Sequence, residues 1–274
     1  MAANQYLLNE LIDAGLDRRE ARWLIDEFSP VGDHETIEAL RAATRRRLDG
    51  EPLQYIIGHW PFRSLDLDLD PRVLIPRPET EELVGVALDV LAASALVTPL
   101  IVDLGCGSGA IGLSLLFELR ERGVHARVVC VDTSSDALDV ARRNARKHNL
   151  ESVTFVRSSW FDEVDPAQRG SFDLIVANPP YVAAAEFAVL DPILSYEPLV
   201  AIVAEDSARA PGFADLAHII AVSPSWLSTG GTLVCEHGNM QRDAVLEAAR
   251  ESSFQRVADR DDIFGNPRIL VATR

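Results

Sequence analysis

A glycine-rich loop preceded by an acid is the strongest chemical signal in the chain. It follows an apolar strand candidate over 100–103, and its residues are Asp103, Gly105, Cys106, Gly107, Ser108 and Gly109. Glycines let the backbone turn sharply and let a ligand lie against bare main chain. The GxGxG spacing alone does not choose the ligand, but the acidic group disfavours a phosphate and favours a cation. S-adenosylmethionine, with its ammonium and sulfonium, fits; a tight turn without a ligand is the alternative.

A second carboxylate, Asp132, ends the next strand candidate, 127–132. In a doubly wound sheet, a carboxylate at this place accepts hydrogen bonds from ribose hydroxyls. Nicotinamide and adenosyl cofactors both have such a ribose, so Asp132 predicts nucleoside binding without choosing between them. The alternative is a role as a helix N-cap, for which Ser134 or Ser135 is better placed.

The sequence Asn178-Pro179-Pro180-Tyr181 follows the apolar strand candidate 173–177. We expect it at the carboxyl edge of the sheet, where open α/β folds bind ligands. Two consecutive prolines fix φ and donate no N–H, so main-chain carbonyls can point into the cleft as free acceptors. The asparagine adds another acceptor and the tyrosine adds a flat face. Together they predict a receptor for a planar –NH2 group.

Further motifs accompany these three. In chain order they are Leu74-Ile75-Pro76-Arg77-Pro78-Glu79-Thr80-Glu81, the glycine-rich loop, Ser159-Trp160-Phe161, Asn178–Tyr181, Tyr196-Glu197-Pro198-Leu199 and Glu236-His237-Gly238. Asp/Asn-Pro-Pro-Tyr after such a loop resembles the amino-methyltransferases, which act on adenine N6, guanine N2 or glutamine N5. The full series is similar to the release-factor glutamine methyltransferases of the HemK/PrmC type, over nearly the whole chain.

The resemblance implies a class I methyltransferase reaction. A methyl group would pass from S-adenosyl-L-methionine to the side-chain amide nitrogen (N5) of the Gln in the Gly-Gly-Gln motif of class-1 peptide chain release factors, leaving S-adenosyl-L-homocysteine. Asp103, the loop 105–109, Asp132, Trp160 and Asn178 would bind the cofactor. The substrate would bind at Asn178, Pro179, Pro180 and Tyr181, of which Asn178, Pro179 and Tyr181 are the expected catalytic residues.

Two positions depart from the family pattern. Ser159 stands where the family usually has Asp, so we do not expect it to bind the adenine amino group. A glycine-rich stretch of the family is altered here to the segment 204–212, so we expect a longer or more mobile loop beside the cleft.

Composition and charge bear on the partners. The chain has 274 residues, with 26 Lys and Arg against 42 Asp and Glu, for a net charge of −16. Affinity for a phosphate backbone comes from Lys and Arg, so direct nucleic-acid binding is not expected. A nucleic-acid adenine N6-methyltransferase therefore remains the less favoured alternative. Methylation of a ribosomal-protein glutamine and a non-catalytic adenosylmethionine-binding factor are the others.

The elements that position these residues follow from periodicity. Apolar residues recur at helical spacing over the first 50 residues, with a break at 29–33, and predict a small helical domain. Alternating residues 65–70 and the run 73–75 predict a β-hairpin. From residue 79 on, strands alternate with helices, which predicts an α/β, doubly wound, mostly parallel Rossmann-like methyltransferase sheet. We therefore expect a helical substrate-docking domain (1–60), a hairpin linker (61–78) and a methyltransferase domain (79–274).

Several smaller features complete the expectations. Arg41, Arg45, Arg46 and Arg47 either complement a helix dipole or form a docking patch. The three cysteines are expected to be buried small residues, and the spacing of the six histidines predicts no metal. The chain shows no apolar run of membrane-spanning length and no signal peptide, so we expect a cytoplasmic protein. We also expect it to act as a monomer.

Overall fold

A seven-stranded sheet forms the centre of the chain in the computed structural model, which describes residues 2–28, 34–94 and 96–274. The strand order is β10-β11-β9-β6-β3-β4-β5. The five strands from β9 to β5 are parallel, whereas β11 and β10 are antiparallel to their neighbours. Their bounds are β3 Leu100–Leu104, β4 Arg127–Asp132, β5 Val153–Arg157, β6 Phe172–Ala177, β9 Leu227–Glu236, β10 Arg256–Asp261 and β11 Pro267–Thr273. The predicted mostly parallel sheet is confirmed.

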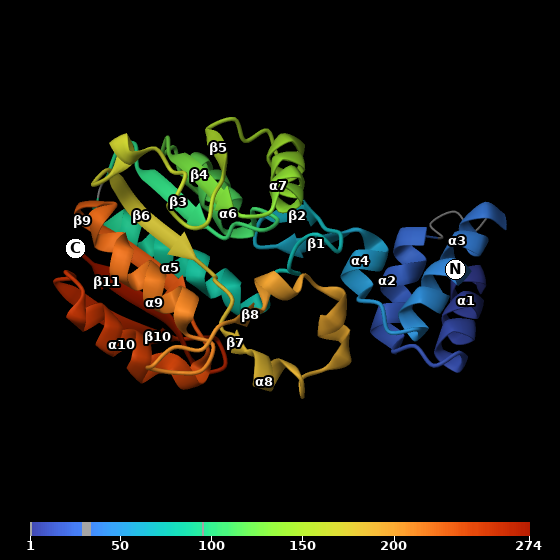
Figure 1. Cartoon of the computed structure of the whole chain (residues 1–274). Coiled ribbons are helices and arrows are strands. Elements are labelled where there is room, and N and C mark those ends of the chain that lie inside the picture. The colour runs from blue at the N-terminus through green and yellow to red at the C-terminus, as the bar shows by residue number, and fades with distance from the viewer. Residues whose placement is uncertain (1, 29–33, 95) are drawn as a thin grey trace.

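Helices cover both faces of this sheet (Figure 1). Along each strand, alternate side chains enter different cores: Ile101 packs with one cluster and Val102 with the other. The first cluster lies under α5 (Pro78–Ser94), α6 (Ala110–Glu121) and α7 (Ser135–Lys147), and the second under α9 (Ala214–Val222) and α10 (Arg242–Glu251). Burial on both faces explains why the central strands are continuously apolar.

Four helices at the N-terminal end form a separate hydrophobic cluster beside the body (Figure 1). They are α1 (Ala2–Asp13), α2 (Arg18–Phe28), α3 (His34–Leu48) and α4 (Leu53–Ile57). The predicted break at 29–33 falls outside the described residues. Leu24, at 0% exposure, and Leu40, at 1%, lie in the middle of this cluster. The helical N-terminal region is confirmed.

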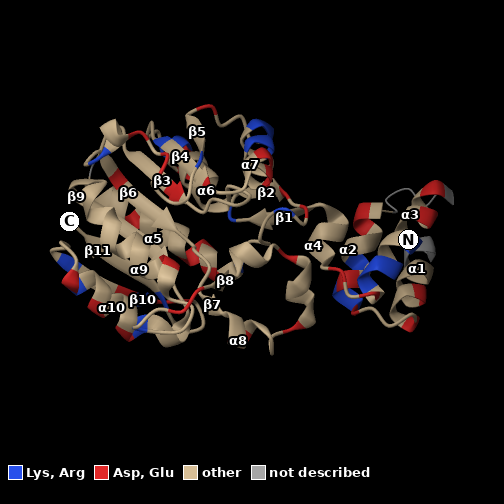
Figure 2. Cartoon of the chain, in the orientation of Figure 1, with Lys and Arg blue, Asp and Glu red and all other residues tan. Residues whose placement is uncertain are grey.

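Figure 2 shows basic positions of α3 close to acidic positions of the same N-terminal region, and most of these basic residues form ion pairs there. Arg41 forms ion pairs with Glu10 and Glu38. Arg46 pairs with Glu51, and Arg47 makes a bidentate pair with Glu20. Since exposed pairs of this kind stabilise a protein only slightly, their main effect is to neutralise the patch.

The linking hairpin is present, but its strands differ from the expected ones. β1 (His59–Phe62) pairs antiparallel with β2 (Leu65–Asp68), so the hairpin precedes the predicted second strand. Residues 73–75 lie outside any strand, and Val73 follows a turn in which its N–H donates to Asp70 O. Their polar groups meet side chains instead: Ile75 N donates to Glu197 Oε2 at 2.9 Å, and Val73 O accepts from Tyr55 OH at 2.6 Å.

Several short elements had no sequence signal. β7 (Val182–Ala183) and β8 (Val203–Ala204) form a two-stranded parallel sheet, and α8 (Ala184–Phe187) follows β7. Single-turn 3₁₀ helices occur at Pro166–Gln168, Pro192–Tyr196, Leu199–Ala201, Ser223–Ser225 and Asn239–Gln241. β7 and β8 matter for the site, because they tie the segment after Tyr181 to the segment before residue 205.

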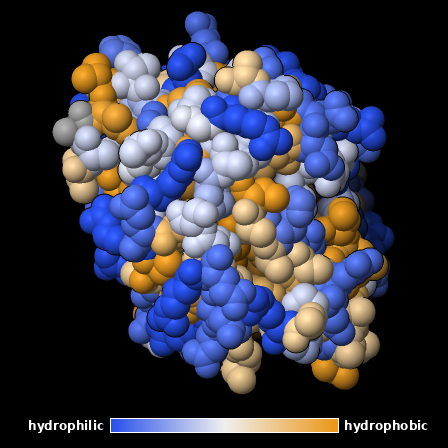
Figure 3. Space-filling model, turned by 60° about the vertical axis from the view of Figure 1, so that its left-hand side comes forward, coloured by the Kyte–Doolittle hydropathy of each residue, from blue (hydrophilic) through white to orange (hydrophobic). Residues whose placement is uncertain are grey.

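The surface seen in Figure 3 is mainly hydrophilic and the cysteines are in the interior, as this architecture requires. Figure 3 shows, on the side of the C-terminal strands, a mainly hydrophilic surface with hydrophobic residues in separate groups. The three cysteines are buried free thiols, as expected. Among the described residues, no helix is long and apolar enough to cross a membrane, and no group of three or more His, Cys, Asp or Glu is arranged to hold a metal ion.

Candidate active site

The glycine-rich loop joins β3 to α6 through three residues with positive φ: Gly105 at 70°, Gly107 at 54° and Gly109 at 84°. This left-handed conformation is strained for residues that carry a Cβ. A Cβ on Gly109 would also lie 2.7 Å from Leu113 Cδ1. Val131 O accepts from Gly105 N at 2.8 Å, which holds the loop against β4.

Asp132 fixes the loop from the neighbouring strand end. Its Oδ2 accepts from Gly107 N and its Oδ1 from Ser134 N, both at 2.9 Å. Ser134 itself caps α7 by accepting from Ala137 N at 3.1 Å, so the cap belongs to Ser134 as the sequence suggested. Burial raises the pKa of Asp132.

Asp103 lies beneath the loop and is fully buried. Its Oδ2 accepts from Gly112 N at 2.8 Å, where a Cβ on Gly112 would lie 2.9 Å from the same oxygen. Its Oδ1 has no hydrogen-bond partner within the described chain. Burial, reinforced by the Asp132 charge, raises the pKa of Asp103 to about 7.

A cavity of about 240 Å³ opens over the loop. Of the predicted cofactor residues, its lining includes Gly105, Gly107, Asp132, Trp160 and Asn178. The other four predicted residues, Asp103, Cys106, Ser108 and Gly109, are behind that lining and shape the loop. Ser108, for example, is buried, and its carbonyl accepts from Asn144 Nδ2 at 2.9 Å.

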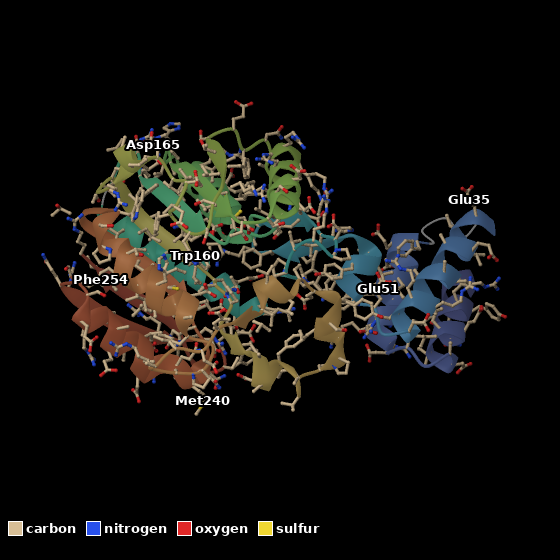
Figure 4. All side chains as sticks on the ribbon, viewed as in Figure 1. Glu35, Glu51, Trp160, Asp165, Met240 and Phe254 are labelled. Atoms are coloured by element: carbon tan, nitrogen blue, oxygen red, sulfur yellow. The ribbon has the colours of Figure 1, made fainter. Side chains whose placement is uncertain are left out.

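Trp160 forms an aromatic wall of this cavity, in the middle of the molecule (Figure 4). Its φ of 46° is an unusual conformation for a bulky residue, and such strain clusters at functional sites. The ring lies against Gly105, where a Cβ would be 3.5 Å from Cζ3. Ser159 and Asp215, from the first turn of α9, also line the cavity, and burial raises the pKa of Asp215.

A second cavity, of about 210 Å³, adjoins the first. All four residues of Asn178–Tyr181 line it, together with Arg77 and apolar side chains of the segment 190–202. The two cavities share Leu74, Asn178, Pro180 and Ala201. A molecule in one cavity would therefore meet a molecule in the other at the Asn178–Pro180 wall.

The Asn178 amide is held by a buried chain of hydrogen bonds. Asn178 Nδ2 donates to Thr80 Oγ1 at 3.1 Å, and Thr80 Oγ1 donates to Glu236 Oε2 at 2.8 Å. Glu236 Oε1 accepts from Tyr181 OH at 3.3 Å. Burial raises the pKa of Glu236, while these hydroxyl donors and the nearby Arg268 oppose the rise.

The altered segment 204–212 supports the Asn178–Tyr181 loop from behind. A Cβ on Gly212, whose φ is 60°, would lie 2.4 Å from Tyr181 O. Gln241 Nε2 donates to Tyr181 O at 3.1 Å and to Pro211 O at 2.9 Å. The segment is also anchored by Arg209, which forms ion pairs with Glu247 and Glu251 of α10.

The segment 74–81 lines the second cavity through Leu74 and Arg77, and it contacts the motifs at 196–199 and 236–238. Arg77 Nη2 donates to Glu197 Oε1 at 2.6 Å, and Glu197 is buried. The quoted motifs thus converge on one region. Sequence reasoning assigned no role to Thr80, Glu236 or Asp215: the first two lie in motifs that it singled out, and Asp215 has no local signal.

The fold and the paired cavities define a methyltransferase of Rossmann-like architecture. A family model described as "Methyltransferase small domain" matches residues 86–195, and one described as "PrmC N-terminal domain" matches residues 5–58. The chain belongs to the family of release factor glutamine methyltransferases. The relative of that name from Haemophilus influenzae is 39% identical, and the match covers 85% of this chain and 79% of the relative. The one from Salmonella typhimurium is 36% identical, and the match covers 96% of this chain and 94% of the relative.

Solved structures show the same fold at low sequence identity. One is the Thermus thermophilus 16S rRNA N2 G1207 methyltransferase in complex with AdoMet and guanosine, with a TM-score of 0.58, 16% identity and coverage of 79% of this chain and 49% of that one. Another is the N-terminal domain of human METTL16 in complex with SAH, with a TM-score of 0.53, 15% identity and coverage of 89% and 83%.

Proposed function

We propose that the chain transfers a methyl group from S-adenosyl-L-methionine to the side-chain amide nitrogen of the Gln in the Gly-Gly-Gln motif of class-1 release factors. The observation that carries the proposal is the shared wall of the two cavities. Asn178 and Pro180 face both, so a donor over the glycine loop and an amide in the second cavity would meet there. The named relatives supply the substrate class.

The residues around the first cavity fit a cationic adenosyl ligand. Asp132 and Asp215 line it, Asp103 lies beneath it with an unpartnered buried oxygen, and Trp160 offers an aromatic face. Asp132 would bind the ribose, and the loop 105–109 would accommodate the amino-acid portion. When bound, S-adenosylmethionine supplies an electrophilic methyl group on its sulfonium.

The second cavity would orient the acceptor amide. Asn178 Oδ1 and Pro179 O accept no hydrogen bond from the described residues, so each is available to one N–H of the glutamine. An amide nitrogen is a poor nucleophile because its lone pair is delocalised into the carbonyl. Two acceptors would favour a pyramidal nitrogen with its lone pair toward the first cavity. Such orientation can supply roughly 7–11 kcal/mol of a barrier.

Proton removal would follow methyl transfer. The ionisable side chains lining the second cavity are Arg77 and Tyr181, and burial raises the pKa of Tyr181 well above its ordinary value. Neither is a base near neutral pH. The amide proton would therefore leave to water after transfer, when the nitrogen has become acidic.

To test the proposal, the full-length protein is incubated with S-adenosylmethionine that carries a labelled methyl group. Three acceptors are offered: a class-1 release factor, a ribosomal-protein mixture and duplex DNA. We expect label on the release factor, at the Gln of Gly-Gly-Gln by peptide mapping. Label on a ribosomal-protein glutamine or on adenine would replace the proposal with the corresponding alternative.

We assign a role to each part of the chain. The helical region 1–60 would dock the protein substrate, and the hairpin region 61–78 would link it to the rest. Catalysis would belong to the region 79–274.

A further inference from the structure

Three polar side chains from separate elements meet under the shared wall of the two cavities. Thr80 lies in the first turn of α5, Asn178 directly follows β6, and Glu236 ends β9. Thr80 and Glu236 are 3% and 1% exposed. Buried polar groups are costly unless they are paired, so this arrangement must satisfy its donors and acceptors internally.

The direction of the hydrogen bonds in this trio is determined by Glu236. Glu236 accepts through both of its oxygens, and the Thr80 hydroxyl donates its proton to Oε2. Thr80 Oγ1 is then left with lone pairs, and Asn178 must present its –NH2 group to it. The consequence is that Asn178 Oδ1 is turned away from Thr80.

Glutamate is suited to this place because it accepts from two hydroxyls at once. Its Oε1 takes the proton of Tyr181 OH, while Arg268 Nη1 approaches the same hydroxyl oxygen at 3.5 Å as a donor. Arg268 also donates to His237 O and pairs with Asp262. A glutamine here could accept from only one of the two hydroxyls, and its –NH2 group would have to face the other.

We infer that Thr80 and Glu236 are positioning residues that fix the Asn178 side chain with its oxygen available to the substrate. The inference rests on the proposed function, because it concerns how the site distinguishes an amide from a carboxylate. An Asn178 amide turned over would offer N–H donors, which suit a glutamate side chain. The correctly turned amide offers an acceptor, which suits glutamine.

The test compares three full-length variants on a Gly-Gly-Gln peptide. Thr80→Val removes the hydroxyl at nearly constant shape, Thr80→Ser keeps it, and Glu236→Gln changes one acceptor into a donor. Thr232→Val is the matched control. Thr232 is also buried, and its hydroxyl hydrogen-bonds to that of Thr273 at 3.1 Å. It lies in the same strand as Glu236 but four residues away, at the opposite end of the part of β9 that pairs with β11.

We expect kcat of Thr80→Val and Glu236→Gln to fall about 10–100-fold, by analogy with residues that orient a metal ligand through a hydrogen bond. Thr80→Ser, which keeps the hydroxyl, should have most of the wild-type kcat. Thr232→Val should keep the wild-type kcat. The Kd for S-adenosylhomocysteine and the Tm should be the same in Thr80→Val as in Thr232→Val.

Two results would overturn the inference. One is a wild-type kcat in Thr80→Val, and the other is an equal loss in Thr80→Ser and Thr80→Val. If Glu236→Gln does not fold, the Thr80 pair decides alone. A wild-type chain that methylates no glutamine refutes the proposed function itself, and is recognised by the absence of product before any variant is compared.

Discussion

Two carboxylates at neighbouring strand ends, Asp103 and Asp132, carry different parts of the site. Asp132 lines the cavity and holds Gly107 N, whereas Asp103 lies beneath the loop and holds the start of α6. Asp132→Ala should weaken S-adenosylhomocysteine binding by about 1.5–3 kcal/mol, the range for a hydrogen bond to a charged group. Calorimetry on the folded variant measures this, and an unchanged Kd would remove Asp132 from the cofactor site.

Asp103 should make cofactor binding depend on pH. Its pKa is about 7 in the free protein, above the ordinary 3.8, so it is largely protonated below pH 7. A cation over the loop favours the ionised form, so binding near pH 7 should release a proton and weaken as the pH falls below 7. Calorimetry in buffers of different ionisation enthalpy detects that proton. Asp103→Asn should abolish the release, and an unchanged release in that variant would contradict the assignment.

The same shift has a consequence for stability. The unfolded chain loses the Asp103 proton near pH 4, whereas the folded chain keeps it to about pH 7. The contribution of Asp103 to the free energy of unfolding is therefore fully present below pH 4, falls between about pH 4 and 7, and is lost above. The difference in Tm between wild type and Asp103→Asn, followed over this range, should show that trend. A difference independent of pH would contradict the shifted pKa.

At this scale the sequence reveals which residues could bind, but not how they are oriented. Asn178 and Asp132 could be predicted because each follows a recognisable apolar strand. Thr80 and Glu236 could not be given a role, because their hydrogen bonds join positions that are far apart in the chain. Side-chain polarity across such distances has no local pattern.

Among the elements, Gly212 shows how a loop outside the motifs supports them. Gly212→Ala would force a Cβ to 2.4 Å from Tyr181 O, so the Asn178–Tyr181 loop must shift and kcat should fall. Shifts of about 1 Å can cost about 100-fold in rate. Gly230→Ala is the control, since Gly230 also has a positive φ but faces open space; it should lose only about 1–2 kcal/mol of stability. Equal kcat values in both variants would show that the loop needs no support from Gly212.

Helices and strands that bury one or both faces could be predicted from their apolar pattern. Elements that bury neither face could not. β4 was placed correctly because its interior, residues 128–131, is continuously apolar and buried. β10, with Arg256, Asp259, Arg260 and Asp261, is a polar edge strand and was missed. The run 73–75 reads as a strand, but its polar groups are satisfied by Glu197 and Tyr55 from distant segments, so no strand partner was needed.

For the whole molecule, the N-terminal helices and the cleft are physically joined. Tyr196 OH, from the segment beside the second cavity, donates to Asp49 O at 3.2 Å. Most of the basic residues of α3 are paired internally, but Arg45 is exposed and has no recorded partner among the described residues. If this region docks the protein substrate, Arg45 is the charge available to it.

Arg45→Glu should therefore raise KM for a whole release factor about twofold to fivefold, as expected for one exposed ion pair, and leave KM for a short peptide unchanged. The rise should shrink with added salt. Arg250→Glu is the control, since Arg250 is likewise exposed in the last turn of a helix, α10. A rise of the same size in both variants, or on both substrates, would argue against docking at α3.

The central claim is that Asn178 receives the amide that is methylated. The most direct measurement is the single-turnover rate of glutamine N5-methylation of a Gly-Gly-Gln peptide, followed by mass spectrometry, for wild type and Asn178→Ala. Asn178 lies at a loop edge, so the variant should fold, and its rate should fall about 10²–10³-fold, as for one preorganised polar contact. Glutamine methylation at the wild-type rate by Asn178→Ala would contradict the account.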